Sequence, residues 1–400
     1  MLTENIKKPD YDKLLSSKCK SLKPSGIRKF FDLAANMEGI VSLGVGEPDF
    51  ATPWFIRERA ISALEHGKTV YTANSGILEL RRAISEYLVR RMNVAYDPER
   101  EIIVTVGGSE AIDLAIRALI DTGDEAIIVE PSFVCYKPIV ELCGGTPVII
   151  ETVPEEQFKL TPEKLLAAIT AKTKILILPF PNNPTGAIME REDLEPIAEI
   201  LRQNEIITIS DEIYAELTYG STKHISIASL PGMRERTLMV NGFSKAYAMT
   251  GWRLGYICGV PELITQMLKI HQYAIMCSPT VSQYAAVDAL RGGDKDVARM
   301  CEEYNIRRRW IVAAFNEIGL SCFEPKGAFY VFPSIKSTGL SSEEFCERLL
   351  NEKHVAVVPG NAFGDSGEGY IRVSYAYSLS HLMTAVEKID EFLTEHNLRN

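Results

Sequence analysis

The chain has 400 residues, of which 46% are hydrophobic and 24% are charged, and its formal net charge is −10. A chain of this length and composition can bury a large core, and we expect two domains that share an interface. The net negative charge argues against a general nucleic-acid surface or an anionic-membrane surface. We therefore expect small-molecule partners, no nucleic acid and no membrane, with a local basic pocket still open to an anionic ligand.

The length of the apolar runs bears on cellular location. The spacing of the cysteines and histidines bears on metal binding. No apolar run approaches the roughly 20 residues that span a bilayer, and residues 1–15 are polar and mixed in charge, unlike a signal peptide. The eight cysteines and six histidines are scattered, without the spacing of a zinc site or a redox pair. We expect a cytoplasmic protein with reduced cysteines and no metal site.

Short β-branched runs alternate with helical patterns between about residues 100 and 260. This alternation predicts a mostly parallel sheet with helices on both faces. The expected strands are Ile102–Val106, Ala126–Glu130, Pro147–Glu151, Ile175–Pro179, Ile206–Ser210, Thr237–Asn241 and Leu254–Cys258. After about residue 290 the pattern changes to long helices and antiparallel-looking strands, at 328–332, 355–358 and 370–374, before a helix over 380–396.

These patterns predict an α/β fold in three parts. Residues 49–290 are expected to form a large domain around the seven-stranded sheet, and residues 291–400 a smaller α+β domain. Residues 1–48 are expected to form an N-terminal arm and part of the smaller domain. Polar motifs follow several predicted strands, where a parallel sheet places its ligand sites: residues 107–109, 183–186, 211 and 244–245.

The segment from Gly242 to Gly255 places Lys245 beside small residues and Arg253 eight positions on. A lysine amine can bond to an aldehyde only if it sheds its proton, which a cationic and partly desolvated site favours. Ser244 and Arg253 can donate hydrogen bonds to a phosphate, the arginine as a planar fork. Taken singly, an exposed lysine and a surface arginine are the simpler interpretation. Together they indicate a site for an aldehyde that carries a phosphate.

The run from Gly107 to Ala111 closes one predicted strand and opens an amphipathic helix over residues 112–120. The start of a helix offers free backbone N–H groups and a partial positive charge, which suit a phosphate. Gly108, Ser109 and Glu110 are therefore candidate phosphate-binding residues. A simple turn capped by Ser109 is the alternative.

All positions from Gly242 to Gly255 match the lysine-attachment signature of the class I and II aminotransferases, the fold type I enzymes that use pyridoxal 5′-phosphate. The chain resembles this family from about residue 25 to its end. It looks nearest to the bacterial branch of aspartate, aromatic and N-acetyl-diaminopimelate aminotransferases. The resemblance implies a homodimer with shared active sites that moves an amino group from an amino acid to a 2-oxo acid, with 2-oxoglutarate as acceptor. Lys245 would hold the cofactor aldehyde and act as catalytic acid and base.

Further residues resemble the cofactor contacts of the family. Asp211 would hold the pyridine nitrogen protonated, and Tyr214 would donate to the phenolic oxygen. Phe133 would stack on the ring, and Tyr71 resembles the tyrosine that reaches the phosphate of the neighbouring subunit. From the residues alone, a helix cap at Asp211 and core packing for Tyr214 and Phe133 stay open.

Three positions resemble the substrate contacts of the family. Asn183, in the run from Asn183 to Gly186, would touch the phenolic oxygen and the substrate carboxylate. Arg372 would grip that carboxylate as a bidentate fork, and Gly46 would offer its backbone to the same group. A proline turn at Asn183 and a structural salt bridge at Arg372 are the alternatives.

The substrate side chain is less well indicated. In some aspartate-specific relatives, a lysine that binds the distal carboxylate stands where Ser109 stands here. Ile27 and Phe133 are apolar and suit aromatic or aliphatic side chains, so we expect aromatic or broad specificity, with aspartate as a further donor. The alternative functions are a fold type I lyase, such as a carbon–sulfur lyase, and a transcription regulator built on this fold. The roughly 45 residues before Gly46 are few for the DNA-binding module of such a regulator.

Overall fold

The computed structural model describes residues 8–24, 26, 37 and 39–398. Its largest sheet has seven strands in the spatial order β2-β8-β7-β6-β5-β3-β4. These strands are β2 (Ile102–Thr105), β3 (Glu125–Glu130), β4 (Thr146–Glu151), β5 (Thr173–Leu178), β6 (Ile207–Asp211), β7 (Thr237–Gly242) and β8 (Gly255–Cys258). Neighbours are parallel except that β8 runs antiparallel to β2 and to β7. The predicted mostly parallel sheet is confirmed, with every strand end within two residues of its expected position.

Helices cover both faces of this sheet, and the side chains of β3 show why. Ala126 and Ile128 lie in the core cluster on one face, whereas Ile127 and Val129 lie in a cluster on the other, as the two-residue period of a strand requires. The first face is covered by α6 (Gly108–Leu119), α7 (Tyr136–Cys143) and α10 (Pro261–Ala274). The second is covered by α8 (Pro162–Ala168), α9 (Arg191–Arg202), α4 (Trp54–Glu65), α5 (Leu78–Met92) and α11 (Thr280–Gly292).

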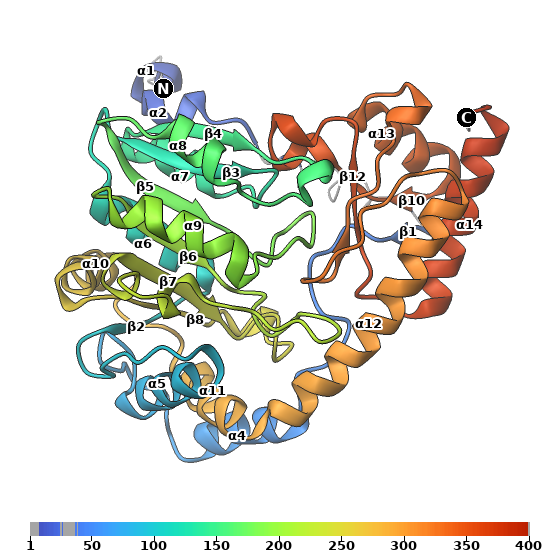
Figure 1. Ribbon diagram of the computed structural model, residues 1–400. Coiled ribbons are helices and arrows are strands. Elements are labelled where there is room, and N and C mark those ends of the chain that lie inside the picture. Colours follow the sequence, from blue (N-terminus) through green and yellow to red (C-terminus); the bar gives the residue numbers. More distant parts are fainter. Residues whose placement is uncertain (1–7, 25, 27–36, 38, 399–400) are drawn as a thin grey trace, which may run out of the picture.

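A second group of elements lies beside this larger lobe, and we call it the smaller lobe (Figure 1). It contains β1 (Val41–Ser42), β9 (Tyr330–Val331), β10 (Val355–Ala356), β11 (Val358–Pro359), β12 (Ile371–Ser374), α13 (Ser342–Lys353) and α14 (Leu379–Glu395). The strands form a two-stranded sheet, β1-β10, and a three-stranded sheet, β11-β12-β9. The long helix α12 (Asp294–Glu317) runs from one lobe to the other (Figure 1). The domain boundaries at residues 48 and 290 stay predictions.

Two predicted strands of the smaller lobe differ from the observed ones. The strand expected over residues 355–358 is split, because β10 pairs with β1 whereas β11 pairs with β12, so the chain changes partner at Val357. The strand expected over 328–332 is paired as β9 only at Tyr330 and Val331. The C-terminal helix expected over 380–396 is confirmed as α14.

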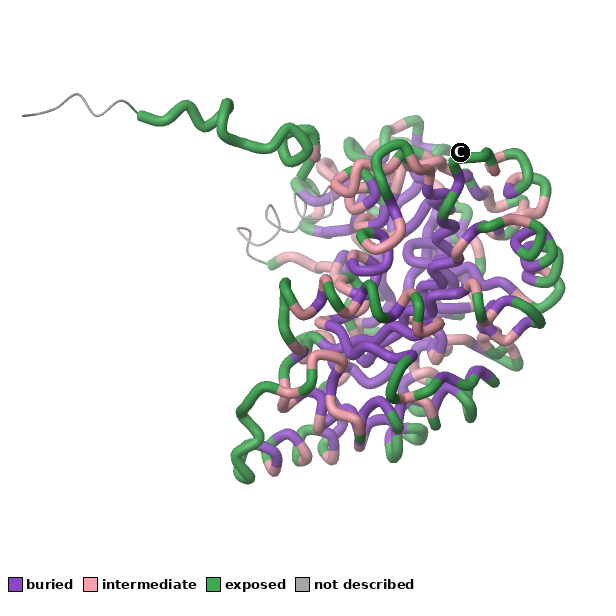
Figure 2. Tube along the Cα trace, turned by 90° about the vertical axis from the view of Figure 1, so that its left-hand side faces the viewer, coloured by how far each residue is buried: buried purple, intermediate pink, exposed green. Residues whose placement is uncertain are grey.

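The N-terminal stretch contacts both lobes. Helices α1 (Tyr11–Leu14) and α2 (Ser17–Ser21) extend from the larger lobe (Figure 2), where Lys18 Nζ donates to the Leu142 carbonyl at 2.9 Å. Further along, β1 joins the smaller lobe, and the backbone N–H of Ser374 donates to the Leu43 carbonyl at 2.8 Å.

Two glycines let β8 lie close to the start of α6. Gly107 has a φ of +79°, in the region that favours glycine. A Cβ atom at Gly255 would lie 2.6 Å from the backbone carbonyl carbon of Gly107 and 2.8 Å from the amide nitrogen of Gly108. These are backbone atoms and cannot rotate aside, so the missing side chain at Gly255 sets how closely the helix start lies against the sheet.

We expect Gly255→Ala to lower the free energy of unfolding by about 1–3 kcal/mol, because overpacking forces the backbone apart. The measurement is urea unfolding followed by circular dichroism. Gly251→Ala is the matched control, because a Cβ there has no heavy atom within 4 Å; its effect should stay within about 0.5 kcal/mol. Equal unfolding midpoints for the two variants would contradict this view of the contact.

Candidate active site

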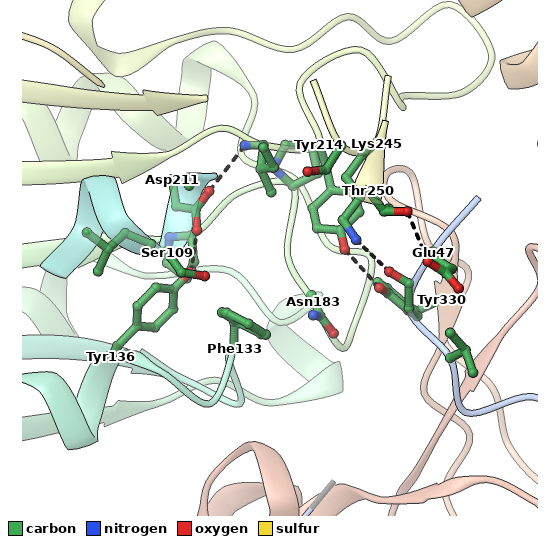
Figure 3. A pocket seen from close by; sticks show the side chains of 18 of the residues that line it. Glu47, Ser109, Phe133, Tyr136, Asn183, Asp211, Tyr214, Lys245, Thr250 and Tyr330 are labelled. Carbon is green, nitrogen blue, oxygen red and sulfur yellow. Dashed lines mark hydrogen bonds between the residues drawn. The ribbon is translucent and has the colours of Figure 1, made fainter. Parts of the chain in front are cut away.

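A cavity of about 430 Å³ lies between the two lobes, past the carboxyl ends of the parallel strands. Most of the predicted site residues line it: Gly46, Gly108, Ser109, Phe133, Asn183, Asp211, Tyr214, Ser244, Lys245, Arg253 and Arg372. Figure 3 shows Ser109, Phe133, Asn183 and Asp211 around one part of it, and Tyr214 and Lys245 beside another. Segments far apart in the sequence therefore converge on one space.

Lys245 follows β7 and reaches into the cavity. Its Nζ donates a hydrogen bond to the Gly46 carbonyl at 2.5 Å. Burial lowers the pKa of the Lys245 amine to about 8, and the cationic Arg372 and Arg253 act in the same direction, whereas Glu47 and Asp211 oppose them. An amine with this pKa is partly neutral near physiological pH and can act as a nucleophile.

The phosphate-binding candidates gather where α6 begins. Gly108 and Ser109 occupy the first turn of α6 and line the cavity. Arg253 lies in the left-handed region with a φ of +51°, and its Nη1 donates to the Thr250 carbonyl at 3.3 Å. A Cβ at Gly107 would lie 2.6 Å from Arg253 Nη2, so the guanidinium packs directly on this backbone. Together with the buried Ser244, these groups form a cradle of hydrogen-bond donors.

Glu110 differs from its neighbours because its side chain does not line the cavity. Its Oε2 accepts from the backbone N–H of Val106 at 2.5 Å, and its Oε1 lies 2.7 Å from Nδ1 of His271 on α10. Only the backbone of Glu110 could therefore contact a ligand in the cavity.

Asp211 ends β6 and is buried beside a hydroxyl that we did not predict. Tyr136 Oη donates to Asp211 Oδ2 at 2.7 Å, and the backbone N–H of Ile213 donates to Oδ1 at 3.2 Å. Burial raises the pKa of the Asp211 carboxyl, although these two bonds and the nearby Lys245 oppose that effect. Tyr136 begins α7 three residues after Phe133, and this spacing was the one signal in the sequence that could have indicated it.

Tyr330 is a second residue that we did not predict. It comes from β9 of the smaller lobe, and its Oη lies 2.8 Å from Tyr214 Oη in the larger lobe (Figure 3). Burial raises the pKa of both phenols. The Tyr330 ring also faces the Arg372 guanidinium, with Cζ 4.5 Å from the ring centroid. In a hydrophobic strand, the sequence alone favours core packing for such a tyrosine.

Arg372 lies on β12 and joins three segments. Its Nη1 donates to Asn183 Oδ1 at 3.1 Å, and its Nη2 donates to the Gly44 carbonyl at 2.5 Å. Phe363 covers the guanidinium, with Cζ 4.8 Å from the ring centroid. The Nε atom is buried and has no hydrogen-bond partner among the described residues. A structural salt bridge is therefore not what holds Arg372 in place within this part of the chain.

The outer part of the cavity carries an acid and a hydroxyl. Thr250 Oγ1 donates to Glu47 Oε2 at 2.9 Å, and both residues line the cavity (Figure 3). Phe133 is half-buried and meets Tyr136 edge to face, with ring centroids 6.1 Å apart.

Tyr71 is a further predicted residue that does not line the cavity. Tyr71 is 78% exposed and lies on the surface of the larger lobe. Ile27, predicted as a substrate contact, lies outside the described residues.

Two further features concern metals and membranes. In the ranges 8–24, 26, 37 and 39–398, no three His, Cys, Asp or Glu side chains are grouped to hold a metal ion, and all eight cysteines are free thiols. Within the same ranges, none of the helices combines the length and apolar character that crossing a membrane requires.

Known proteins resemble this chain over nearly its full length. The model for "Aminotransferase class I and II" matches residues 38–389. The protein YugH of Bacillus subtilis is 54% identical over 95% of this chain and 98% of its own length. The aspartate aminotransferase of Pyrococcus abyssi is 47% identical over 96% of this chain and 99% of its own. The solved aromatic aminotransferase of Pyrococcus horikoshii is 45% identical and superposes with a TM-score of 0.89, over 93% of this chain and 100% of its own.

The family match, these identities and the shared fold identify the reaction class, and enzymes of this class transfer amino groups with pyridoxal 5′-phosphate. The chain is a transaminase and belongs to the class I and II aminotransferase family.

Proposed function

We propose that this transaminase moves the amino group of an amino acid with an aromatic or aliphatic side chain to a 2-oxo acid, with 2-oxoglutarate as acceptor. One observation carries the proposal: Lys245, Asp211, Arg253 and Arg372 all line one cavity. Each offers a group that a different part of the cofactor or substrate requires.

The donors and acceptors of the cavity fit pyridoxal 5′-phosphate. The backbone of Gly108 and Ser109, the Ser244 hydroxyl and the Arg253 guanidinium suit its phosphate. Asp211 suits the pyridine nitrogen, because a cation beside this carboxyl would offset the burial that raises its pKa. When bound, the cofactor supplies an aldehyde for amines and a ring that accepts an electron pair from the substrate Cα.

The remaining cofactor contacts would come from three side chains. Tyr214 and Asn183 would donate to the phenolic oxygen, and Phe133 would lie against the ring. Tyr136 would act through Asp211, since its hydroxyl already donates to that carboxylate. All of these side chains line the same cavity as Lys245.

Lys245 would carry out the proton transfers. Its amine, with a pKa of about 8, would take the proton that leaves the substrate Cα and hold it for transfer. General acid–base catalysis of this kind contributes about 10² to 10⁴-fold in rate. The Gly46 carbonyl, which accepts from Nζ at 2.5 Å, would hold the amine when it is not bonded to the cofactor.

Arg372 would bind the carboxylate that both substrates carry next to the reacting carbon. Its buried Nε has no partner among the described residues, and Asn183 lies 3.1 Å from Nη1. A guanidinium can meet a carboxylate through two parallel hydrogen bonds, which fixes the substrate in orientation as well as in charge. Gly46 lines the same cavity and would offer its backbone as a further contact.

The lining favours an apolar substrate side chain. Its cations are Lys245, Arg253 and Arg372, and each already has a proposed role, so the described lining holds no further cation for a distal carboxylate. Glu47 adds a negative charge at the outer part of the cavity. Aspartate is therefore the weaker donor in this proposal. 2-Oxoglutarate also carries a distal carboxylate, so its role as acceptor rests on the family resemblance and not on this lining.

We also propose a homodimer in a reducing, cytoplasmic setting. Large apolar side chains are exposed on two segments that lie far apart in the sequence, α4 with the loop after it and the end of α10 with the residues after it: Trp54, Ile61, Leu64, Val70, Tyr71, Tyr273, Ile275 and Met276. Hydrogen bonds from Asn74 to the Met276 carbonyl and from Thr280 to the Val70 carbonyl join these segments. Burying this surface against a second copy would let Tyr71 reach the partner's phosphate site. Sedimentation of the holoenzyme should give a dimer at micromolar concentration, and a monomer alone would contradict the proposal.

The pKa of Lys245 can be tested on the cofactor-free protein. The rate at which an amine-directed acylating reagent modifies Lys245 should rise with pH around a midpoint of about 8, because only the neutral amine reacts. Lys174 is an internal control, since its ion pair with Asp124 raises its pKa, and its rate should rise only at higher pH. Mass spectrometry of both peptides gives the two profiles. Coinciding midpoints would exclude a lowered pKa at Lys245.

A donor panel with 2-oxoglutarate tests the proposed substrate class. We expect kcat/KM for phenylalanine, tyrosine or leucine to exceed that for aspartate by at least about tenfold, which corresponds to about 1.4 kcal/mol. The assay follows glutamate formation. Aspartate as the best donor would contradict the proposal. Release of ammonia and pyruvate from cystathionine, without glutamate, would indicate a carbon–sulfur lyase instead.

Two variants complete this assay. Lys245→Ala should abolish transfer with every donor. Arg372→Lys keeps the charge but loses the fork, so kcat/KM should fall more than about tenfold for all donors alike. Unchanged kinetics in Arg372→Lys would remove Arg372 from the substrate site.

A further inference from the structure

Two side chains lie behind the phosphate cradle rather than in it. Glu110, at the third position of α6, is 12% exposed in its side chain, whereas the side chain of His271 on α10 is fully buried. Glu110 Oε1 lies 2.7 Å from His271 Nδ1, and Oε2 accepts from the Val106 N–H at 2.5 Å. The carboxylate therefore joins α10 to the turn between β2 and α6.

The histidine has a definite hydrogen-bonding arrangement. An ionised carboxylate can only accept, so His271 donates from Nδ1. Its Nε2 is buried and has no partner among the described residues. In the tautomer with its proton on Nδ1, the buried Nε2 carries no hydrogen. Every N–H group of the ring then has an acceptor. The ring hydrogen-bonds to Glu110, which makes support of that carboxylate the evident use of this buried side chain.

The turn that Glu110 holds is the one that carries the cradle. Val106 is held at both of its backbone groups: its N–H donates to Glu110, and its carbonyl lies 3.5 Å from Arg253 Nη2. Gly107 follows and packs against the Arg253 guanidinium, and Gly108 and Ser109 then face the cavity. A shift of Val106 would move both the helix start and the arginine.

The direction of the carboxylate supports this view. An acid in the first turn of a helix is favoured by the helix dipole, but a carboxylate facing the cavity would repel a phosphate there. The two hydrogen bonds of Glu110, to Val106 and His271, direct its carboxylate away from the cavity. The carboxylate can therefore stabilise the start of the helix without facing a phosphate in the cavity.

We propose that Glu110 and His271 form a positioning pair that holds the turn from Val106 to Ser109 in the conformation that receives the phosphate of the cofactor. The inference rests on the proposed function, because it concerns the phosphate end of the same site. The pair acts through the backbone and touches neither the reacting atoms nor the substrate.

The test compares binding of pyridoxal 5′-phosphate and of pyridoxal, which lacks the phosphate, to the cofactor-free protein. The ratio of the two dissociation constants, measured by fluorescence titration, reports the contribution of the phosphate. In His271→Gln and in Glu110→Ala we expect this ratio to change by at least about tenfold, through weaker binding of the phosphorylated ligand. Binding of pyridoxal should change by less than about twofold.

Matched variants separate positioning from general stability. His271→Asn places an amide N–H near the position of Nδ1 and should retain the wild-type ratio, whereas glutamine places its amide near Nε2. Asp113→Ala removes an acid from the same helix, where it pairs with Arg117, and should also retain the ratio. Glu110→Ala provides the measurement if His271→Gln does not fold.

An unchanged ratio in Glu110→Ala would overturn the inference. The ratio would stay unchanged if neither affinity changed, or if both fell equally, which a merely structural pair would give. A wild-type protein that binds pyridoxal 5′-phosphate no better than pyridoxal would overturn the proposed phosphate site itself, and the inference with it. The wild-type titration therefore distinguishes the two failures.

Discussion

The gathering of positive charge around one partly buried lysine is the constraint on which the site depends. Lys245, Arg253 and Arg372 share one cavity, and desolvation together with the two guanidinium groups lowers the pKa of the lysine to about 8. Arginine keeps its proton under such conditions, whereas lysine gives it up. The same field that would suit two anionic ligand groups thus also leaves the amine partly neutral near physiological pH. The acids Glu47 and Asp211 limit this effect without reversing it.

Both lobes of the fold contribute residues to this cavity. Parallel strands bring Asp211 and Lys245 to one edge of the sheet, and Gly255 lets β8 lie close to the start of α6. The smaller lobe contributes Arg372 and Tyr330, which reach Asn183 and Tyr214 across the cavity. The two lobes therefore meet at the site through hydrogen bonds and also through aromatic contacts, such as the edge-to-face pair of Tyr214 and Phe329.

Much of this arrangement could be predicted from the sequence, because parallel strands place their carboxyl ends, and the residues that follow them, at one edge of the sheet. Residues that follow predicted strands, such as Ser109, Asp211 and Lys245, were expected at one edge and lie there. Arg372 comes from the other lobe, so it needed the family resemblance. Tyr136 and Tyr330 were not predicted, because a tyrosine on a helix or strand is ambiguous until its hydroxyl is seen beside a partner. The outward turn of the Glu110 side chain depends on His271, which lies 161 residues away in the sequence.

The stretch from β1 to Gly46 has a consequence for how the lobes and the lysine are connected. It is tied to the smaller lobe by the β1-β10 pairing, by the Ser374 bond to Leu43 and by the Arg372 bond to Gly44. Two residues further on, it presents the carbonyl that accepts from Lys245. A displacement of the smaller lobe relative to the sheet would therefore also change the distance between that carbonyl and the lysine amine.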